Sequence, residues 1–134
     1  MYEIGSGALS RCSVLNYVKL PKDLKIIEAY LFRTCYQLKS IEIPEGVTEI
    51  GNAAFYGCSS LRSINIPEGV TSIGGNAFAN CNSLNSITFN AINCVNMATM
   101  EGSVPKPAFD NKSINSITFG NRVEIIPDYA FMGC

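Results

Sequence analysis

Cysteine is the residue type whose number and spacing first suggest chemistry in this 134-residue chain. Of six cysteines, four follow one another at intervals of 23 residues: Cys12, Cys35, Cys58 and Cys81. Zinc sites use closer pairs such as Cys-x-x-Cys, which the sequence lacks. The regular interval instead predicts one cysteine per repeat, stacked in a column about 5 Å apart. We favour a column of buried, reduced thiols, with a disulfide between stacked cysteines or a bound metal as the alternatives.

The other chemistry-bearing residues argue against an enzyme. Histidine is absent, which excludes the Ser-His-Asp and Cys-His arrangements and an imidazole general base. A pair of carboxylates could serve a glycosidase, but Glu45 and Glu68 recur at the same position of a repeat and so reflect the repeat itself. The glycines also follow the repeat and form no phosphate-binding loop. We therefore predict no enzyme, no catalytic, metal-binding or cofactor-binding residue, and no cofactor.

Two isolated features remain. Cys94 lies outside the 23-residue series, and we expect a packed thiol there, with an accessible and reactive thiol as the alternative. The tripeptide Asn111-Lys112-Ser113 matches the glycosylation sequon, a motif of low specificity that we interpret as accidental.

The segments that carry the cysteines form a repeat. Two windows, which start at Cys35 and Cys58, align without gaps as CYQLKSIEIPEGVTEIGNAAFYGC and CSSLRSINIPEGVTSIGGNAFANC. The segments before Cys35 and from Ile114 onward fit the same frame in degenerate form. Between Leu84 and Ile114 the interval is 30 residues, 7 more than the repeat, and we predict an irregular insertion at about 90–107.

Each part of the repeat predicts a local structure. Alternation in residues 41–44 (Ile-Glu-Ile-Pro) has the period of a half-buried strand, which the proline ends because it cannot donate a ladder hydrogen bond. Val47 and Ile50 predict a second short extended segment, and Gly51 permits a tight bend. Phe55 then points into the interior before a short 3₁₀ or helical turn. Since one unit cannot bury this face alone, we expect stacked units in which like side chains meet along one axis.

The shared pattern L-x-S-I-x-I-P-x-x-V-x-x-I-G-x-x-A-F-x-x-C resembles the BspA-type (Treponema-type) leucine-rich repeat over nearly the whole chain, except where the spacing shifts at 90–107. The resemblance implies a mainly β, right-handed solenoid with short strands and short 3₁₀ or helical turns. We expect about five turns in a single domain over residues 1–134. The resemblance also implies a surface protein of mucosal bacteria or some protists, where several relatives are described as adhesins or host-contact proteins.

Both ends of the sequence fall within a repeat. Tyr2-Glu3-Ile4-Gly5 resembles part of a unit already begun, and Cys134 would open the next one. We therefore expect a fragment of a longer array, with irregular terminal caps as the alternative. An exposed last turn would favour end-to-end self-association through unpaired strand edges.

If the strands line one face, their outward positions form columns that a partner can contact. The candidate residues for this partner-binding face are Lys19, Lys39, Glu42, Arg62, Asn65, Asn85 and Thr88. The face consists mainly of Ser, Thr and Asn, with weak positive character toward its N-terminal half. It lacks the clustered Trp, Tyr and Arg that are typical of binding hot spots, so a merely solvated face is the alternative.

The insertion is a second candidate for partner contact, because insertions in a solenoid emerge as loops, often on the binding side. Met97, Met100 and Val104 could form an adaptable apolar surface. They could equally fold over the stack and cover its Phe and Ile side chains, and we favour this structural role. A hydrolase hidden in the inserted loop is a weaker hypothesis.

Composition narrows the class of partner. The chain is 47% hydrophobic and 16% charged, with a formal net charge of −1. It has no basic stripe for nucleic acid, no apolar run near the roughly 20 residues needed for direct membrane insertion, and no signal peptide at its N-terminus. The resemblance places the full-length parent at the cell surface or among secreted proteins. We predict a non-enzymatic recognition module that binds a protein or glycan through the strand-lined face, or alternatively a structural spacer or assembly scaffold without a ligand.

Overall fold

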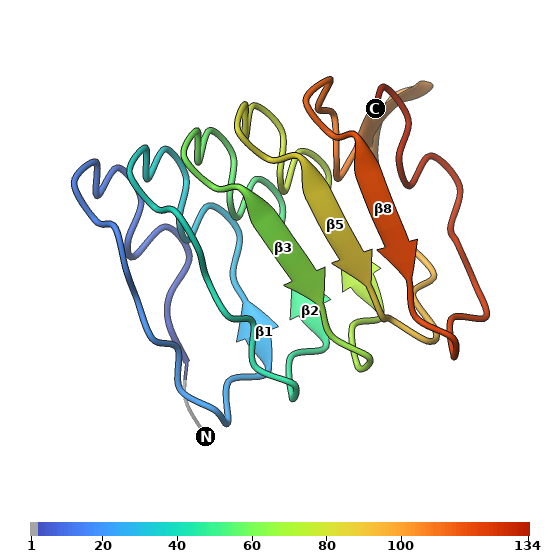
Figure 1. Cartoon of the computed structure of the whole chain (residues 1–134), viewed down its shortest axis with the longest axis horizontal. Coiled ribbons are helices and arrows are strands. Elements are labelled where there is room, and N and C mark those ends of the chain that lie inside the picture. The colour runs from blue at the N-terminus through green and yellow to red at the C-terminus, as the bar shows by residue number, and fades with distance from the viewer. Residues whose placement is uncertain (1–2) are drawn as a thin grey trace.

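The computed structural model describes residues 3–134, so Tyr2 and its place in the repeat lie outside the described residues. The chain winds in successive coils that follow one another from the N-terminal to the C-terminal end (Figure 1). The strands of the described residues are β1 (Ile26–Ile27), β2 (Glu49–Ile50), β3 (Ser63–Ile66), β4 (Ser72–Ile73), β5 (Ser86–Phe89), β6 (Ala98–Glu101), β7 (Val104–Pro107) and β8 (Ser116–Phe119).

Two parallel sheets join the coils. Strands β3, β5 and β8 form one sheet, and the shorter strands β1, β2 and β4 form the other. In the first sheet Ser63 pairs with Ser86 and Ser86 with Ser116, so like residues of successive repeats lie side by side. Figure 1 shows β3, β5 and β8 next to one another, with β1 and β2 behind them. The predicted second extended segment is confirmed by β1, β2 and β4, in which Ile50 pairs with Ile27 and Ile73.

The first two coils differ from the prediction on the side of the first sheet. The segments 15–20 and 38–43 contain no paired strand, although Leu20, Leu38 and Ile43 are buried as the alternating pattern requires. These coils are joined instead through β1 and β2 and through their turn segments, where the Leu9 N–H donates to the Leu31 carbonyl at 3.1 Å.

The expected 3₁₀ or helical turns are also corrected: the corresponding segments are hydrogen-bonded turns, and residues 3–134 contain no helix. The reason is a third ladder between coils. The N–H groups of Tyr30, Phe32 and Thr34 donate to carbonyls of the next coil at 2.9, 2.7 and 2.7 Å, so they are not available for bonds within a helix. Tyr30 and Thr34 have φ values of 61° and 57°, in the left-handed region, which interrupts any helical run.

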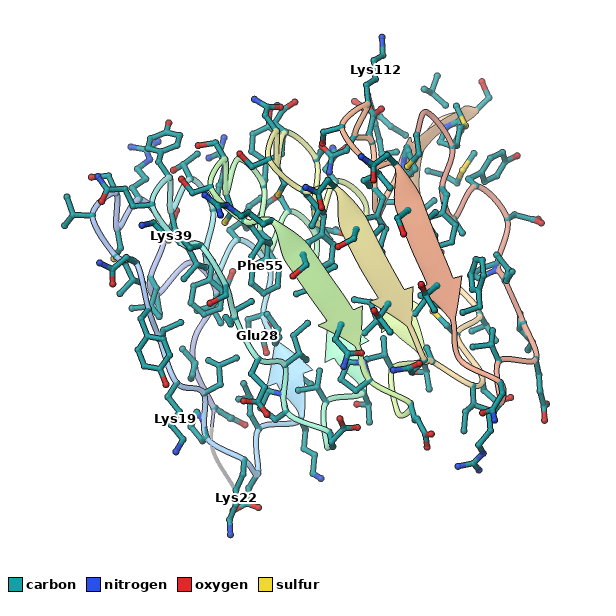
Figure 2. All side chains as sticks on the ribbon, viewed as in Figure 1. Lys19, Lys22, Glu28, Lys39, Phe55 and Lys112 are labelled. Carbon is teal, nitrogen blue, oxygen red and sulfur yellow. The ribbon has the colours of Figure 1, made fainter. Side chains whose placement is uncertain are left out.

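A column of phenylalanines fills the centre of the stack. The rings of Phe32, Phe55, Phe78 and Phe109 are fully buried and nearly parallel, with successive centroids 5.2, 4.9 and 4.6 Å apart. Figure 2 shows Phe55 inside the stack. The expected alignment of like side chains along one axis is confirmed by this column.

The segment 90–107, expected to be an irregular insertion, contains regular structure in two parts. Its first part continues the repeat: Cys94 and Met97 are fully buried, and Ser72 forms a parallel bridge with Asn96. Strands β6 and β7 then form an antiparallel hairpin. The repeat pattern did not predict the first part because Cys94 and Met97 replace the valine and isoleucine that the repeat uses there.

Candidate functional site

The predicted partner-binding face is only partly assembled as expected. Arg62, Asn65, Asn85 and Thr88 are exposed on the coils of β3 and β5, where Asn65 is directly paired with Thr88. The Asn85 N–H donates to the Arg62 carbonyl at 3.0 Å, so these two residues are also neighbours on adjacent coils. The structure thus brings these four residues together on one sheet.

The other three predicted residues are exposed on the first two coils, which no strand joins on this side. Lys19 and Glu42 line a groove of about 640 Å³ that lies between these coils. Lys39 lies on the second coil outside the groove lining, and Figure 2 shows both lysines at the N-terminal end of the molecule. The face therefore has a flat, paired part and a grooved, unpaired part.

A second candidate surface, which we call the hairpin groove, was missed by the sequence analysis. Its volume is about 690 Å³, and hairpin β6–β7 forms one wall with Thr99, Met100, Glu101 and Lys106. The turn segments of the first coils form the remainder, with Tyr30, Arg33, Asn52, Ala53, Tyr56, Gly75 and Asn76. The residue types at these positions differ from one repeat to the next, so the conserved repeat pattern does not indicate a binding surface here. The 23-residue spacing of Arg33 and Tyr56 was the available clue.

Hydrogen bonds hold the hairpin against the stack. The Asn52 Oδ1 atom accepts a bond from the Thr99 hydroxyl at 2.9 Å and one from the Gly75 N–H at 3.0 Å. The same Gly75 N–H lies 2.9 Å from the Thr99 hydroxyl oxygen. Because three polar groups from three coils meet at this point, the wall of the groove has a fixed place relative to its floor.

The aromatic part of the groove is also fixed by neighbouring side chains. The Arg33 guanidinium lies 5.7 Å from the centroid of the Tyr56 ring, within the range of a cation–π interaction. The Tyr56 hydroxyl accepts a hydrogen bond from the Asn80 side-chain amide at 2.7 Å. Tyr30 is 46% exposed, so its ring is available for contact.

The apolar residues Met97, Met100 and Val104 do not share one role: the sequence suggests either contact with a partner or cover of the core. Met97 is fully buried and packs in the core, as the structural role predicts. Met100 and Val104 are about half exposed on the hairpin and cover none of the Phe and Ile side chains of the core. The preference for a structural role is therefore correct for one of the three residues only.

The cysteines have a structural role in the stack. Cys35, Cys58 and Cys81 are fully buried, as predicted, whereas Cys12 is half-buried; all six cysteines are free. The Cys58 thiol donates to the Phe32 carbonyl at 3.2 Å and the Cys81 thiol to the Phe55 carbonyl at 3.1 Å. Each thiol thereby donates a hydrogen bond to a carbonyl of the preceding coil. A bound metal or a disulfide would break this bond.

Asn111 takes the place of a cysteine in this column. It is buried, and its side-chain amide donates to the Phe78 carbonyl, the bond that a thiol makes in the preceding coils. This amide nitrogen is the atom that N-glycosylation would modify. The interpretation of the Asn111–Ser113 sequon as accidental is therefore supported by a structural role for its asparagine.

Burial raises the pKa of the column thiols. The pKa of Cys81 is raised to about 12 and that of Cys94 to about 11, in both cases mainly by desolvation, which disfavours the thiolate. For Cys58 the pKa is raised by desolvation and then by the nearby thiols of Cys81 and Cys35. The packed, unreactive thiol expected for Cys94 is consistent with its full burial.

We expect these thiols to make the protein less stable in alkali. An unfolded cysteine loses its proton near pH 9.0, whereas folded Cys81 keeps it to about pH 12. Its contribution is therefore complete below pH 9, and the free energy of unfolding falls between these limits by up to about 1.4 kcal/mol per pH unit for this thiol. Urea unfolding near pH 8 and near pH 10.5 should show a fall that is about 2 kcal/mol smaller in Cys81→Ala than in the parent chain. Equal falls in both proteins would contradict this assignment.

Two further observations concern the part of the chain that the structure describes. No group of three or more Cys, Asp or Glu side chains in residues 3–134 is arranged to hold a metal ion. No helix in the same residues has the length and hydrophobicity that crossing a bilayer requires.

Comparisons with known proteins agree with this architecture. The model of the BspA type leucine-rich repeat region matches residues 1–102 and 102–134, with six copies of the repeat. A leucine-rich repeat protein from Bacteroides ovatus superimposes with a TM-score of 0.63 and 28% identity over 96% of this chain and 37% of that chain. The Treponema pallidum leucine-rich repeat protein superimposes with a TM-score of 0.57 and 22% identity, over 90% of this chain and 64% of that one. The chain thus spans less than two thirds of either protein, and no curated protein matches it.

Proposed function

The chain belongs to the BspA-type leucine-rich repeat family, and from this premise we propose that it is a non-enzymatic recognition module that binds a protein or glycan through its strand-lined face. Leucine-rich repeats are in general non-enzymatic and commonly mediate protein interactions. The contact surface consists of the sheet β3–β5–β8 and the adjoining first two coils.

The observation that carries the proposal is the continuous, exposed row of polar side chains on this sheet. Asn65 and Thr88 are paired on β3 and β5, and Arg62 and Asn85, which directly precede these strands, are joined by a backbone hydrogen bond. The relative positions of the four residues are therefore fixed before any partner arrives. A preorganised surface loses little side-chain and backbone freedom on binding. Extended faces of this kind are the surfaces that solenoids present to partners.

The test is a triple alanine variant of Lys39, Glu42 and Arg62. Binding of the parent chain to immobilised extracellular-matrix proteins and glycans is measured first, by surface plasmon resonance. We expect the triple variant to weaken any binding found by at least tenfold, since two cations and one anion of the face are removed. A matched variant, with Arg11, Lys112 and Glu124 changed to alanine, also removes two cations and one anion, but these residues neither line the groove of the first two coils nor lie on β3, β5 or β8. It should bind like the parent.

Two outcomes contradict the proposal. Undiminished binding by the triple variant would assign recognition to another surface. Absence of binding to the whole panel would favour a structural spacer or assembly scaffold, in which the repeats project or connect other domains.

The proposal also covers the architecture of the chain, the location of its parent protein and its self-association. We propose a right-handed solenoid of about five turns that forms a single domain over residues 1–134. BspA-type repeats are typically found in surface or secreted bacterial proteins, which supports a surface or secreted parent. The last described coil exposes Phe119, Ile126 and Tyr129, which supports end-to-end self-association, because apolar groups exposed at one end of a stack favour contact with a second copy.

A further inference from the structure

The hairpin groove differs in chemistry from the strand-lined face. Its lining includes two tyrosines and an arginine beside its asparagines, whereas the strand-lined face consists mainly of Ser, Thr and Asn. We propose that the hairpin groove is a second binding site, which takes an acidic sugar, that is, a sugar ring that carries a carboxylate. This proposal does not depend on the strand-lined face, because no residue of that face lines the groove.

The charges of the groove favour an anion. Lys106 Nζ lies 3.4 Å from Glu101 Oε2, so these two side chains of the hairpin form an ion pair with each other. Arg33 is the remaining charged side chain of the lining, and no ion pair within residues 3–134 includes it. Its guanidinium presents a planar fork of N–H donors, which matches the two oxygens of a carboxylate. The groove therefore offers one uncompensated positive charge with the geometry for this group.

The tyrosines supply surfaces for the ring of the sugar. Tyr56 is held between the Arg33 guanidinium and the Asn80 amide, so its ring keeps one orientation. Tyr30 lies on the preceding coil in the same lining, with its ring about half exposed. Tyrosine rings combine a large apolar surface with little conformational freedom to lose. They can therefore pack against the C–H groups of a sugar without reorganisation.

Side-chain amides supply the polar contacts. The Asn52 oxygen already accepts two hydrogen bonds, which orients its NH₂ group. The side chain of Asn76 makes no hydrogen bond within the described residues. An amide carries both donors and an acceptor, and this combination suits the hydroxyl groups of a sugar.

The size of the groove and its polarity favour a sugar over a peptide. A volume of about 690 Å³ lies within the roughly 300–1,000 Å³ that is typical of small-ligand sites. Ala53 and Met100 are the aliphatic side chains of the lining, so the groove has no apolar pocket for the hydrophobic anchor that peptide recognition commonly uses.

The experiment compares two acidic probes with a neutral one. The acidic probes are sialyllactose and a second sugar, a disaccharide that ends in glucuronic acid; the neutral probe is lactose. Each probe is titrated into the protein, and binding is followed by calorimetry and by amide shifts in nuclear magnetic resonance spectra. We expect at least one acidic probe to bind at least tenfold more tightly than lactose, with shifted amides around Arg33 and Tyr56. Which of the two acidic probes binds distinguishes a sialic acid from a uronic acid. Absence of binding by both up to about 10 mM, or equal binding of lactose, would overturn the proposal.

Two variants test the site itself. Arg33→Gln removes the uncompensated charge and should weaken binding at least tenfold. Tyr30→Asn removes a ring and keeps the left-handed backbone, because Asn76 has the equivalent place in its repeat with a φ of 58°. This variant should also lose binding while it melts like the parent chain.

The control is Lys112→Gln, which removes one positive charge from an exposed side chain that points away from the stack (Figure 2). It should bind the acidic probe like the parent chain. Unchanged binding in both Arg33→Gln and Tyr30→Asn, or an equal loss in Lys112→Gln, would refute the assignment of this groove.

Discussion

Replacing Gly51 by alanine is expected to destabilise the fold by at least about 3 kcal/mol. A Cβ atom at this position would lie 2.4 Å from the Ala29 backbone nitrogen and 2.8 Å from the Ala29 Cα atom. These atoms belong to the neighbouring coil and cannot rotate away as a side chain would. The coils must therefore separate, which strains the bonds between β1 and β2 and loosens the packing beside them.

Urea unfolding followed by circular dichroism measures this effect. The matched control is Gly5→Ala. Gly5 has the same place in its repeat as Gly51, with Glu28 at this place in the repeat between them. No heavy atom lies within 4 Å of a Cβ atom added at Gly5. We expect the control to unfold within about 0.5 kcal/mol of the parent chain, as most surface substitutions do. Equal stability of the two variants would mean that the coils are not in close contact at Gly51.

Phe55→Ala should be the other strongly destabilising substitution. The Phe55 ring is fully buried between those of Phe32 and Phe78, with centroids 5.2 and 4.9 Å away. Truncation removes the buried apolar surface and leaves a cavity in the middle of the column, and changes of this kind lower the free energy of unfolding by about 3–5 kcal/mol. Because each coil contacts only its neighbours, the two halves of the stack also lose part of their coupling.

Phe119→Ala is the control for this prediction. Phe119 is 42% exposed on the last sheet strand, β8, and so loses much less buried surface by the same chemical change. We expect a loss less than half of that for Phe55→Ala, together with a broader urea transition for Phe55→Ala alone. Similar losses in the two variants would contradict the central place of the phenylalanine column.

The identical repeats explain why the register could be predicted from the sequence. Once Cys35, Cys58 and Cys81 are placed over one another, the phenylalanines and the isoleucines of the strands must align as well, and the structure confirms this alignment. Periodic patterns report the side chains that face the core, because burial selects the same residue types in each coil. The burial of Leu20 and Leu38 was predictable on the same grounds.

Two features that the sequence does not predict are properties of the backbone: which segments pair as strands, and which residues have left-handed φ values. The 15–20 and 38–43 segments have the alternating pattern of strands, yet no paired strand forms there, since the pattern reports burial and not pairing with a neighbour. Tyr30 and Thr34 have left-handed φ values although neither is a glycine, so their residue types do not predict this conformation. Their conformation is imposed by the hydrogen bonds to the next coil, a constraint between coils that local propensity does not contain.

The hairpin groove could not be predicted for a related reason. Tyr30 and Arg33 come from one coil, Tyr56 from the next and Met100 from the insertion. None of them recurs as the same residue type in the next repeat, so apart from the 23-residue spacing of Arg33 and Tyr56 the sequence does not connect them. Only the stacking of the coils and the position of the hairpin bring these side chains to one place.

The hairpin also shows that the stack can be lengthened locally while the later coils keep their packing. Directly beyond it the Phe109 ring stacks on Phe78 at 4.6 Å, as closely as any pair in the column. The hairpin tip at Gly102 has no heavy atom within 4 Å of the position of an added Cβ. A peptide inserted at this tip would therefore be exposed to solvent and would leave the packing of the coils on either side intact.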